Sequence, residues 1–132
     1  MWHLLSFLFM AVIYGLSSRS DAGGIPLAAP WDKVAHAIAY FVLGYLLARA
    51  TKRPNLAWVI AAWFGALDEV HQAFVPGREA GLDDWWADLF GSLLGSRVGS
   101  WQHQRISRRR QRRRQHLNQA RATPSYFPPR AP

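Results

Sequence analysis

The sequence predicts an all-α fold: a polytopic membrane protein with four transmembrane helices in a compact bundle and a disordered basic C-terminal tail. Its apolar residues gather in four segments separated by short connections rich in Pro, Gly or charge. Ala, Leu and Gly dominate these segments over alternating β-branched residues, which favours helices over strands. The last 36 of the 132 residues hold 10 of the 16 basic residues and no acid. We therefore expect a helical domain over residues 1–98 and a tail over residues 99–132.

The first two segments, Trp2–Leu16 and Val34–Ala48, are nearly free of polar residues. The first carries no charge and no polar stripe at the 3.6-residue period, which a helix of a soluble bundle would show. It also lacks the basic beginning of a signal peptide. The second has one polar interruption, His36, before it reaches the basic residue Arg49. Because about 20 apolar residues span a hydrocarbon core, flanking residues must complete both helices.

The third and fourth segments are apolar helices with polar residues near one end. Leu56–Val75 begins as LAWVIAAWFGAL and then turns polar as DEVHQAFV. Asp84–Val98 contains one internal acid and a GxxxG pattern formed by Gly91 and Gly95. Small residues at this spacing let two helices approach closely, so we expect the two glycines to pack inside the bundle.

The charge of the connections predicts how the bundle is oriented in the membrane. Connection 49–55 holds three basic residues and no acid, whereas connection 17–33 is neutral overall and connection 76–83 has a net charge of −1. Basic residues accumulate on the cytoplasmic side of membrane proteins. With four spans, the N-terminus and the tail are therefore expected in the cytoplasm, and connections 17–33 and 76–83 outside.

Polar side chains from three helices are expected to converge near the outer end of the bundle. Asp32, His36 and Tyr40 follow one another at intervals of four residues and therefore share one helix face. The others occupy the end of the third segment, the connection after it and the start of the fourth segment. The predicted ligand-binding set is Asp32, His36, Tyr40, Asp68, Glu69, Gln72, Arg78, Asp84 and Asp88.

Ionisable residues inside a membrane are costly, so they mark functional sites by default. A structural interpretation pairs the acidic residues with His36 and Arg78 to hold the helices together. A functional interpretation makes them an outward-facing cavity for a lipid-linked or peptide-like ligand. If the site is catalytic, the candidates are Glu69 as general base and His36 as acid or orienting group, with Arg78 holding an anion. A metal site at Asp32, His36, Glu69 and His71 has no specific ligand spacing, so we expect no metal and no cofactor.

The tail has the composition of a membrane-surface anchor. Residues 105–114 read RISRRRQRRR and contain no aromatic residue. Directly after a membrane span, such a run is attracted to anionic lipid, by about 1 kcal/mol for each nearby basic residue. We favour this interpretation over nucleic-acid binding. The following Pro-rich segment, residues 123–132, is expected to be disordered.

The combined spacing of these residues resembles the VanZ-like membrane protein family, over about residues 4–98. The resemblance is carried by Ser17-Ser18 at the end of the first helix, by Asp32-Lys33 with His36 and Tyr40, by Asp68-Glu69 with Gln72, and by Pro76-Gly77-Arg78 followed by Asp84, Gly91 and Gly95. Two positions depart from the family pattern. Asp88 stands where the family usually has Asn, and Gly81 stands where Ser is common.

The resemblance implies a small multi-pass protein of the bacterial cytoplasmic membrane. The founding member of the family gives low-level resistance to teicoplanin, a lipid-bearing glycopeptide antibiotic. We therefore expect an envelope protein that binds or modifies a surface lipid or glycan precursor, or the glycopeptide itself. The alternative is a non-catalytic structural or interaction protein whose charges only lock the bundle. The sequence leaves both catalysis and simple binding open.

The predicted topology can be tested with single cysteines, because the natural chain contains none. In intact cells, Ser20→Cys and Gly81→Cys should react with a membrane-impermeant maleimide, since both lie in outer connections. Thr51→Cys should react only after lysis. The reverse pattern of labelling would place the polar residues on the cytoplasmic side.

Overall fold

The computed structural model describes residues 1–20, 30–78 and 81–122, and these residues form four helices and no strand. The helices are α1 (Trp2–Ser17), α2 (Trp31–Thr51), α3 (Pro54–Gln72) and α4 (Leu82–Ala122). The predicted all-helical fold is therefore confirmed, and each helix contains most of one of the four apolar segments.

Local sequence signals explain where the second and third helices begin and end. Asp32 lies in the first turn of α2, where a negative charge complements the helix dipole. The helix ends at Thr51, and the next residue, Lys52, adopts a left-handed conformation with φ of 58° and donates its backbone N–H to the carbonyl of Ala48. Pro54 then occupies the first turn of α3, where its missing N–H costs nothing. The short turn folds α3 back antiparallel to α2.

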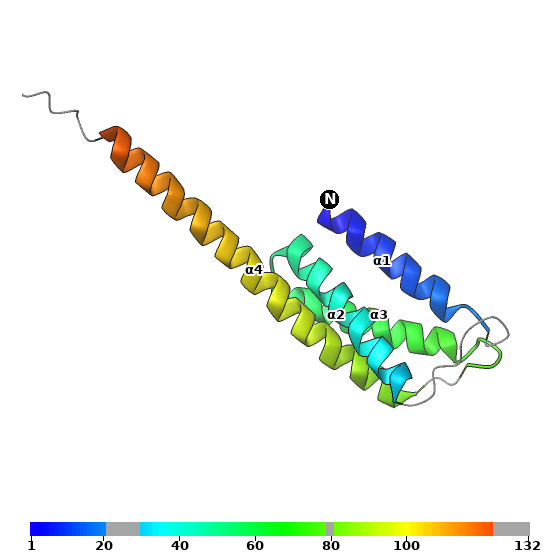
Figure 1. Ribbon diagram of the computed structural model, residues 1–132. Helices are drawn as coiled ribbons and strands as arrows, with labels where there is room; N and C mark the ends of the chain where they lie inside the picture. The colour runs from blue at the N-terminus through cyan, green and yellow to red at the C-terminus, as the bar shows by residue number, and fades with distance from the viewer. Residues whose placement is uncertain (21–29, 79–80, 123–132) are drawn as a thin grey trace, which may run out of the picture.

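The helix α2 is the centre of the bundle, because its contacts with the other helices are the most extensive, above all those with α4. Figure 1 shows α2 and α3 between α1 on one side and the long α4 on the other. The ends of α1 and α3 and the starts of α2 and α4 lie at the same end of the bundle (Figure 1). The buried apolar core is drawn from α1, α2 and α3 and consists of Ile13, Tyr40, Leu43, Leu47, Ala48, Ala57 and Ala61.

The backbones of α2 and α4 approach each other closely along a stripe of glycines. A Cβ atom at Gly91 would collide with the backbone of Ala37, and one at Gly95 would collide with the backbone of Phe41. Gly44 of α2 lies equally close to the backbone of α4. The successive contacts advance by four residues on both helices, so α2 and α4 run parallel. The GxxxG pattern thus packs within the bundle in this structure.

One helix in the described part of the chain, α2, is long and apolar enough to cross a membrane by length and composition. The helix α1 is also apolar but has 16 residues. Residue count alone gives α2 a length of about 30 Å, which is close to the thickness of a hydrocarbon core.

The tail differs from the expected disorder, because α4 continues as one helix through Ala122. Residues 100–122 contain no Gly or Pro, and Arg, Gln and Ala are strong helix formers. With 41 residues, α4 is about 60 Å long, so its Arg-rich half projects beyond the other helices (Figure 1). The Pro-rich segment 123–132, for which disorder was expected, lies outside the described residues.

The glycine stripe generates a prediction about stability. Gly95→Ala should lower the free energy of unfolding by about 1–3 kcal/mol, because the added methyl group forces two helix backbones apart. Gly15→Ala is the matched control, since no atom lies within 4 Å of a Cβ built there. Thermal unfolding of both variants in detergent micelles measures the difference. Equal unfolding temperatures for the two variants would contradict the close approach of α2 and α4.

Candidate functional site

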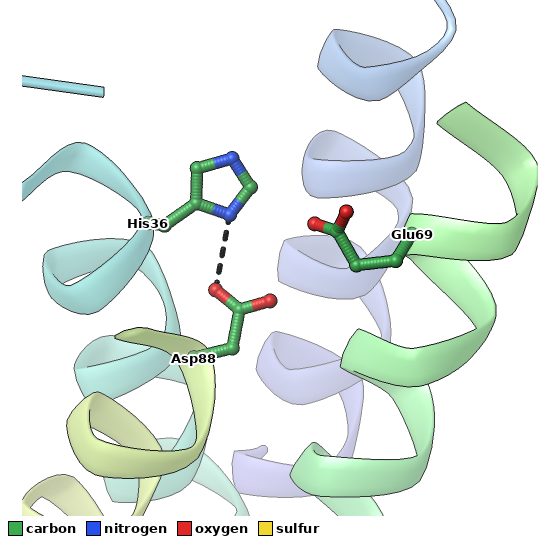
Figure 2. A group of neighbouring side chains, drawn as sticks. All are labelled: His36, Glu69 and Asp88. Carbon is green, nitrogen blue, oxygen red and sulfur yellow. Dashed lines mark hydrogen bonds and ion pairs between the residues drawn. The ribbon is translucent and has the colours of Figure 1, made fainter. Parts of the chain in front are cut away.

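Three ionisable side chains from three helices converge at one point in the bundle. His36 comes from α2, Glu69 from α3 and Asp88 from α4, and Figure 2 shows their polar ends directed toward a common space. His36 Nδ1 lies 3.0 Å from Asp88 Oδ1. One nitrogen or oxygen atom from each residue lies within 4.8 Å of the others. We call these three residues the acid–histidine cluster.

Asp88 is buried and His36 and Glu69 are half-buried, yet two carboxylate oxygens of the cluster have no hydrogen-bond partner among the described residues. Asp88 is 0% exposed, and its Oδ2 is unpaired. Glu69 accepts a hydrogen bond from the Gly81 backbone N–H at 3.0 Å through Oε2, whereas its Oε1 is buried and unpaired. An unsatisfied buried carboxylate oxygen is costly and requires an explanation. These two oxygens are the atoms through which the cluster could bind a ligand.

Gly65 of α3 lies close to the unpaired oxygen of Asp88. A Cβ atom at Gly65 would lie 3.1 Å from Asp88 Oδ2 and 3.1 Å from Cε1 of Tyr40. Tyr40 is almost fully buried, and its hydroxyl group also has no partner in the described part of the chain. The glycine therefore lets α3 approach this pair of polar side chains, and a larger residue would crowd them.

A lysine near the start of α2 joins the same two helices by ion pairs. Lys33 Nζ lies 3.2 Å from Asp84 Oδ1 and 3.7 Å from Asp83 Oδ2. Its backbone N–H donates to the Asp32 side chain, so Asp32 binds its own helix terminus and does not join the acid–histidine cluster. Lys33 and Asp84 instead add a second link between α2 and α4, on the N-terminal side of His36 and Asp88.

The remaining predicted residues form a separate group that attaches α1 to α3. Asp68 is nearly fully buried and accepts hydrogen bonds from the Ser17 hydroxyl at 2.6 Å and from the Gln72 amide at 3.0 Å. Arg78 donates to the backbone carbonyl of Leu16 at 3.0 Å, so it does not pair with a carboxylate there. The structure thus separates Asp68, Gln72 and Arg78 from the acid–histidine cluster, because consecutive residues of α3 face different neighbouring helices.

Sequence reasoning missed several residues at these two groups. Lys33 and Gly65 were not among the predicted site residues, although Lys33 lies one turn before His36 and therefore shares its face of the helix. The sequence indicates Ser17 only as part of the family pattern. Its role as a hydrogen-bond donor to a buried carboxylate could not be inferred without knowing which helix faces Asp68.

An apolar cavity of about 420 Å³ lies beside the acid–histidine cluster. Among the described residues, Glu69 is the one charged residue that lines it, and the others come from α3 and the residue after it, and from α4 and the residue before it. They are Ala66, Val70, Ala73, Gly81, Leu82 and Trp85. A carboxylate at the edge of an apolar space suits an amphiphilic ligand with a polar head and a hydrocarbon part.

Four packed helices with ionisable groups converging inside them define an all-helical bundle with a buried charged site. A family model described as VanZ/LLP1 matches residues 2–101. The chain therefore belongs to the VanZ/LLP1 family, which confirms the resemblance seen in the sequence. Both polar groups lie within the matched residues. Comparison with curated proteins and with solved structures finds no match.

The group around Asp68 generates a prediction that uses two adjacent serines. Ser17→Ala should lower the free energy of unfolding by about 1–3 kcal/mol, because it removes a hydrogen bond from a buried carboxylate. Ser18→Ala is the matched control, since the Ser18 hydroxyl pairs with His71 at an exposed position. Thermal unfolding in detergent compares the two variants. A larger loss for Ser18→Ala would show that Asp68 does not depend on the Ser17 hydroxyl.

Proposed function

We propose that this protein spans the bacterial cytoplasmic membrane four times and binds an amphiphilic envelope ligand at an outward-facing acid–histidine cluster. The ligand class is a lipid-linked glycan precursor or a lipid-bearing glycopeptide. The observation that carries the proposal is the apolar cavity lined in part by Glu69, whose Oε1 has no hydrogen-bond partner among the described residues. A hydrocarbon chain in the cavity would place the polar head of the same molecule next to the cluster.

Exposed apolar side chains support a membrane environment for all four helices. Soluble monomers rarely expose large contiguous apolar patches, and here each helix presents several large apolar residues to its surroundings. They include Leu4, Phe7, Leu8, Val12, Trp31, Val34, Ile38, Val59, Trp63, Leu67, Val70, Trp86, Phe90 and Leu94. Lipid contact would satisfy these surfaces without a protein partner.

Aromatic and basic residues support the proposed orientation. At the end of the bundle from which the Arg-rich helix projects, Arg49 lies over the ring of Trp2 at 4.5 Å, and the Tyr45 hydroxyl donates to Gln102 at 2.7 Å. Trp and Tyr are typical of membrane interfaces, and Arg favours the cytoplasmic side. The acid–histidine cluster is near the opposite end, which would then face outward. The Arg-rich part of α4 would bind anionic lipid on the cytoplasmic surface.

A purely structural role is the second candidate, and one observation favours it. The His36–Asp88 and Lys33–Asp84 pairs both join α2 to α4, as charges that only lock a bundle would do. Glu69 separates the two proposals, because its Oε1 has no partner and contributes no such link among the described residues. Under ligand binding Glu69 is essential, whereas under the structural role its charge is dispensable.

The functional test compares teicoplanin susceptibility in cells that express the wild type, Glu69→Gln or His36→Ala, with membrane abundance quantified in the same cells. We expect the wild type to raise the inhibitory concentration and both variants to return it to the empty-vector value while they remain abundant. Asp83→Asn is the control, since this side chain is 79% exposed, and it should protect as the wild type does.

Two outcomes would contradict the proposal. Abundant wild-type protein without protection would show that teicoplanin resistance does not extend to this chain. If abundant Glu69→Gln protects fully, the acid–histidine cluster is not needed for protection, and the structural role is favoured.

A further inference from the structure

We infer that His36, Glu69 and Asp88 form a binding site for one divalent transition-metal cation, of the Zn²⁺ or Mn²⁺ class. The three side chains come from α2, α3 and α4 and direct one imidazole and two carboxylates into the same space (Figure 2). This donor set suits such cations, which bind His nitrogen together with Asp or Glu oxygen. Cation binding at this cluster does not depend on the amphiphilic envelope ligand proposed above.

The distances between the donor atoms are compatible with one ion. The three atoms lie within 4.8 Å of one another, and His36 Nδ1 is already 3.0 Å from Asp88 Oδ1. Ligand atoms around a tetrahedral Zn²⁺ lie about 3.3 Å apart, since each bond is about 2.0–2.2 Å long. The donor atom of Glu69 must therefore come closer by up to about 1.5 Å to complete the site, a shift that its flexible side chain allows.

The unpaired oxygens are the independent evidence for a cation. Asp88 is 0% exposed, and its Oδ2 and Oε1 of Glu69 are both buried without a hydrogen-bond partner in the described part of the chain. Among the described residues, no Lys or Arg forms an ion pair with either carboxylate. The nearby Lys33 pairs with Asp83 and Asp84 instead. Two buried carboxylates beside one imidazole leave a negative site, and a bound cation would neutralise it.

The backbone of α3 packs closely against one side of the site. A Cβ atom at Gly65 would lie 3.1 Å from Asp88 Oδ2, so a larger residue there would crowd this oxygen. Binding would replace the proton shared by His36 and Asp88, so metal uptake should release a proton to solvent. The site differs from the four residues considered from the sequence, since Asp88 joins it and neither Asp32 nor His71 does.

The test is metal binding by the full-length protein, purified in detergent with a tag that contains no histidine. After treatment with EDTA and desalting, the protein is incubated with Zn²⁺ or Mn²⁺, desalted again and analysed for metal by mass spectrometry. The wild type should retain one equivalent of at least one cation and unfold at a higher temperature with it. Wild-type protein that retains well below one equivalent of both would overturn the proposal without any variant.

Matched variants locate the ion. His36→Asn, Glu69→Gln and Asp88→Asn should each weaken metal affinity by more than about tenfold, because each removes one direct ligand. His71→Asn and Asp83→Asn remove the same kinds of group outside the cluster and should bind metal as the wild type does. Unchanged affinity in folded variants of the three cluster residues, or an equal loss in the two controls, would overturn the assignment. Since the metal alone is the probe, a failure here is distinguishable from a failure to protect against teicoplanin.

Discussion

The close approach of α2 and α4 is the constraint on which the candidate site depends. Gly91 lies against the backbone of Ala37, and these residues directly follow the region in which Asp88 meets His36. A side chain at position 91 would separate the helices and pull the carboxylate away from the imidazole. The glycines of α4 therefore set both the distance and the register at which the buried charges come together. Packing and chemistry are coupled along one helix interface.

The group around Asp68 and the acid–histidine cluster contain similar residues in different arrangements. Asp68 is held by hydroxyl and amide donors from Ser17 and Gln72, an arrangement that satisfies one carboxylate oxygen and fastens α1. Asp88 shares one hydrogen bond with His36, and its other oxygen has no partner among the described residues. Each carboxylate keeps one buried oxygen without a partner among the described residues, so the two groups differ in their neighbours: Asp68 accepts from uncharged donors, whereas Asp88 lies with His36 and Glu69 in one cluster.

Helix-forming tendency and environment act differently along α4. Its first half has glycines and serines on the face toward α2 and large apolar residues on the outer face. Its second half makes few contacts with the other helices. It is stabilised by the intrinsic helix propensity of its Arg, Gln and Ala residues. Trp101 contributes locally, since Arg105 lies over its ring at 3.8 Å. Composition had suggested disorder for this stretch because the run of like charges outweighed the helix propensity of the same residues.

The sequence by itself determined the all-helical fold, the four helices, the family and the use of Gly91 and Gly95 in close packing. Each follows from apolar segments, local spacing or residue size, which are properties of nearby residues. The tertiary structure decided which polar residues meet. Consecutive residues of α3 point about 100° apart, so Asp68 faces α1 while Glu69 faces α2 and α4. Helical periodicity gives the face that a residue occupies, but only the packing of the helices decides which neighbour that face meets.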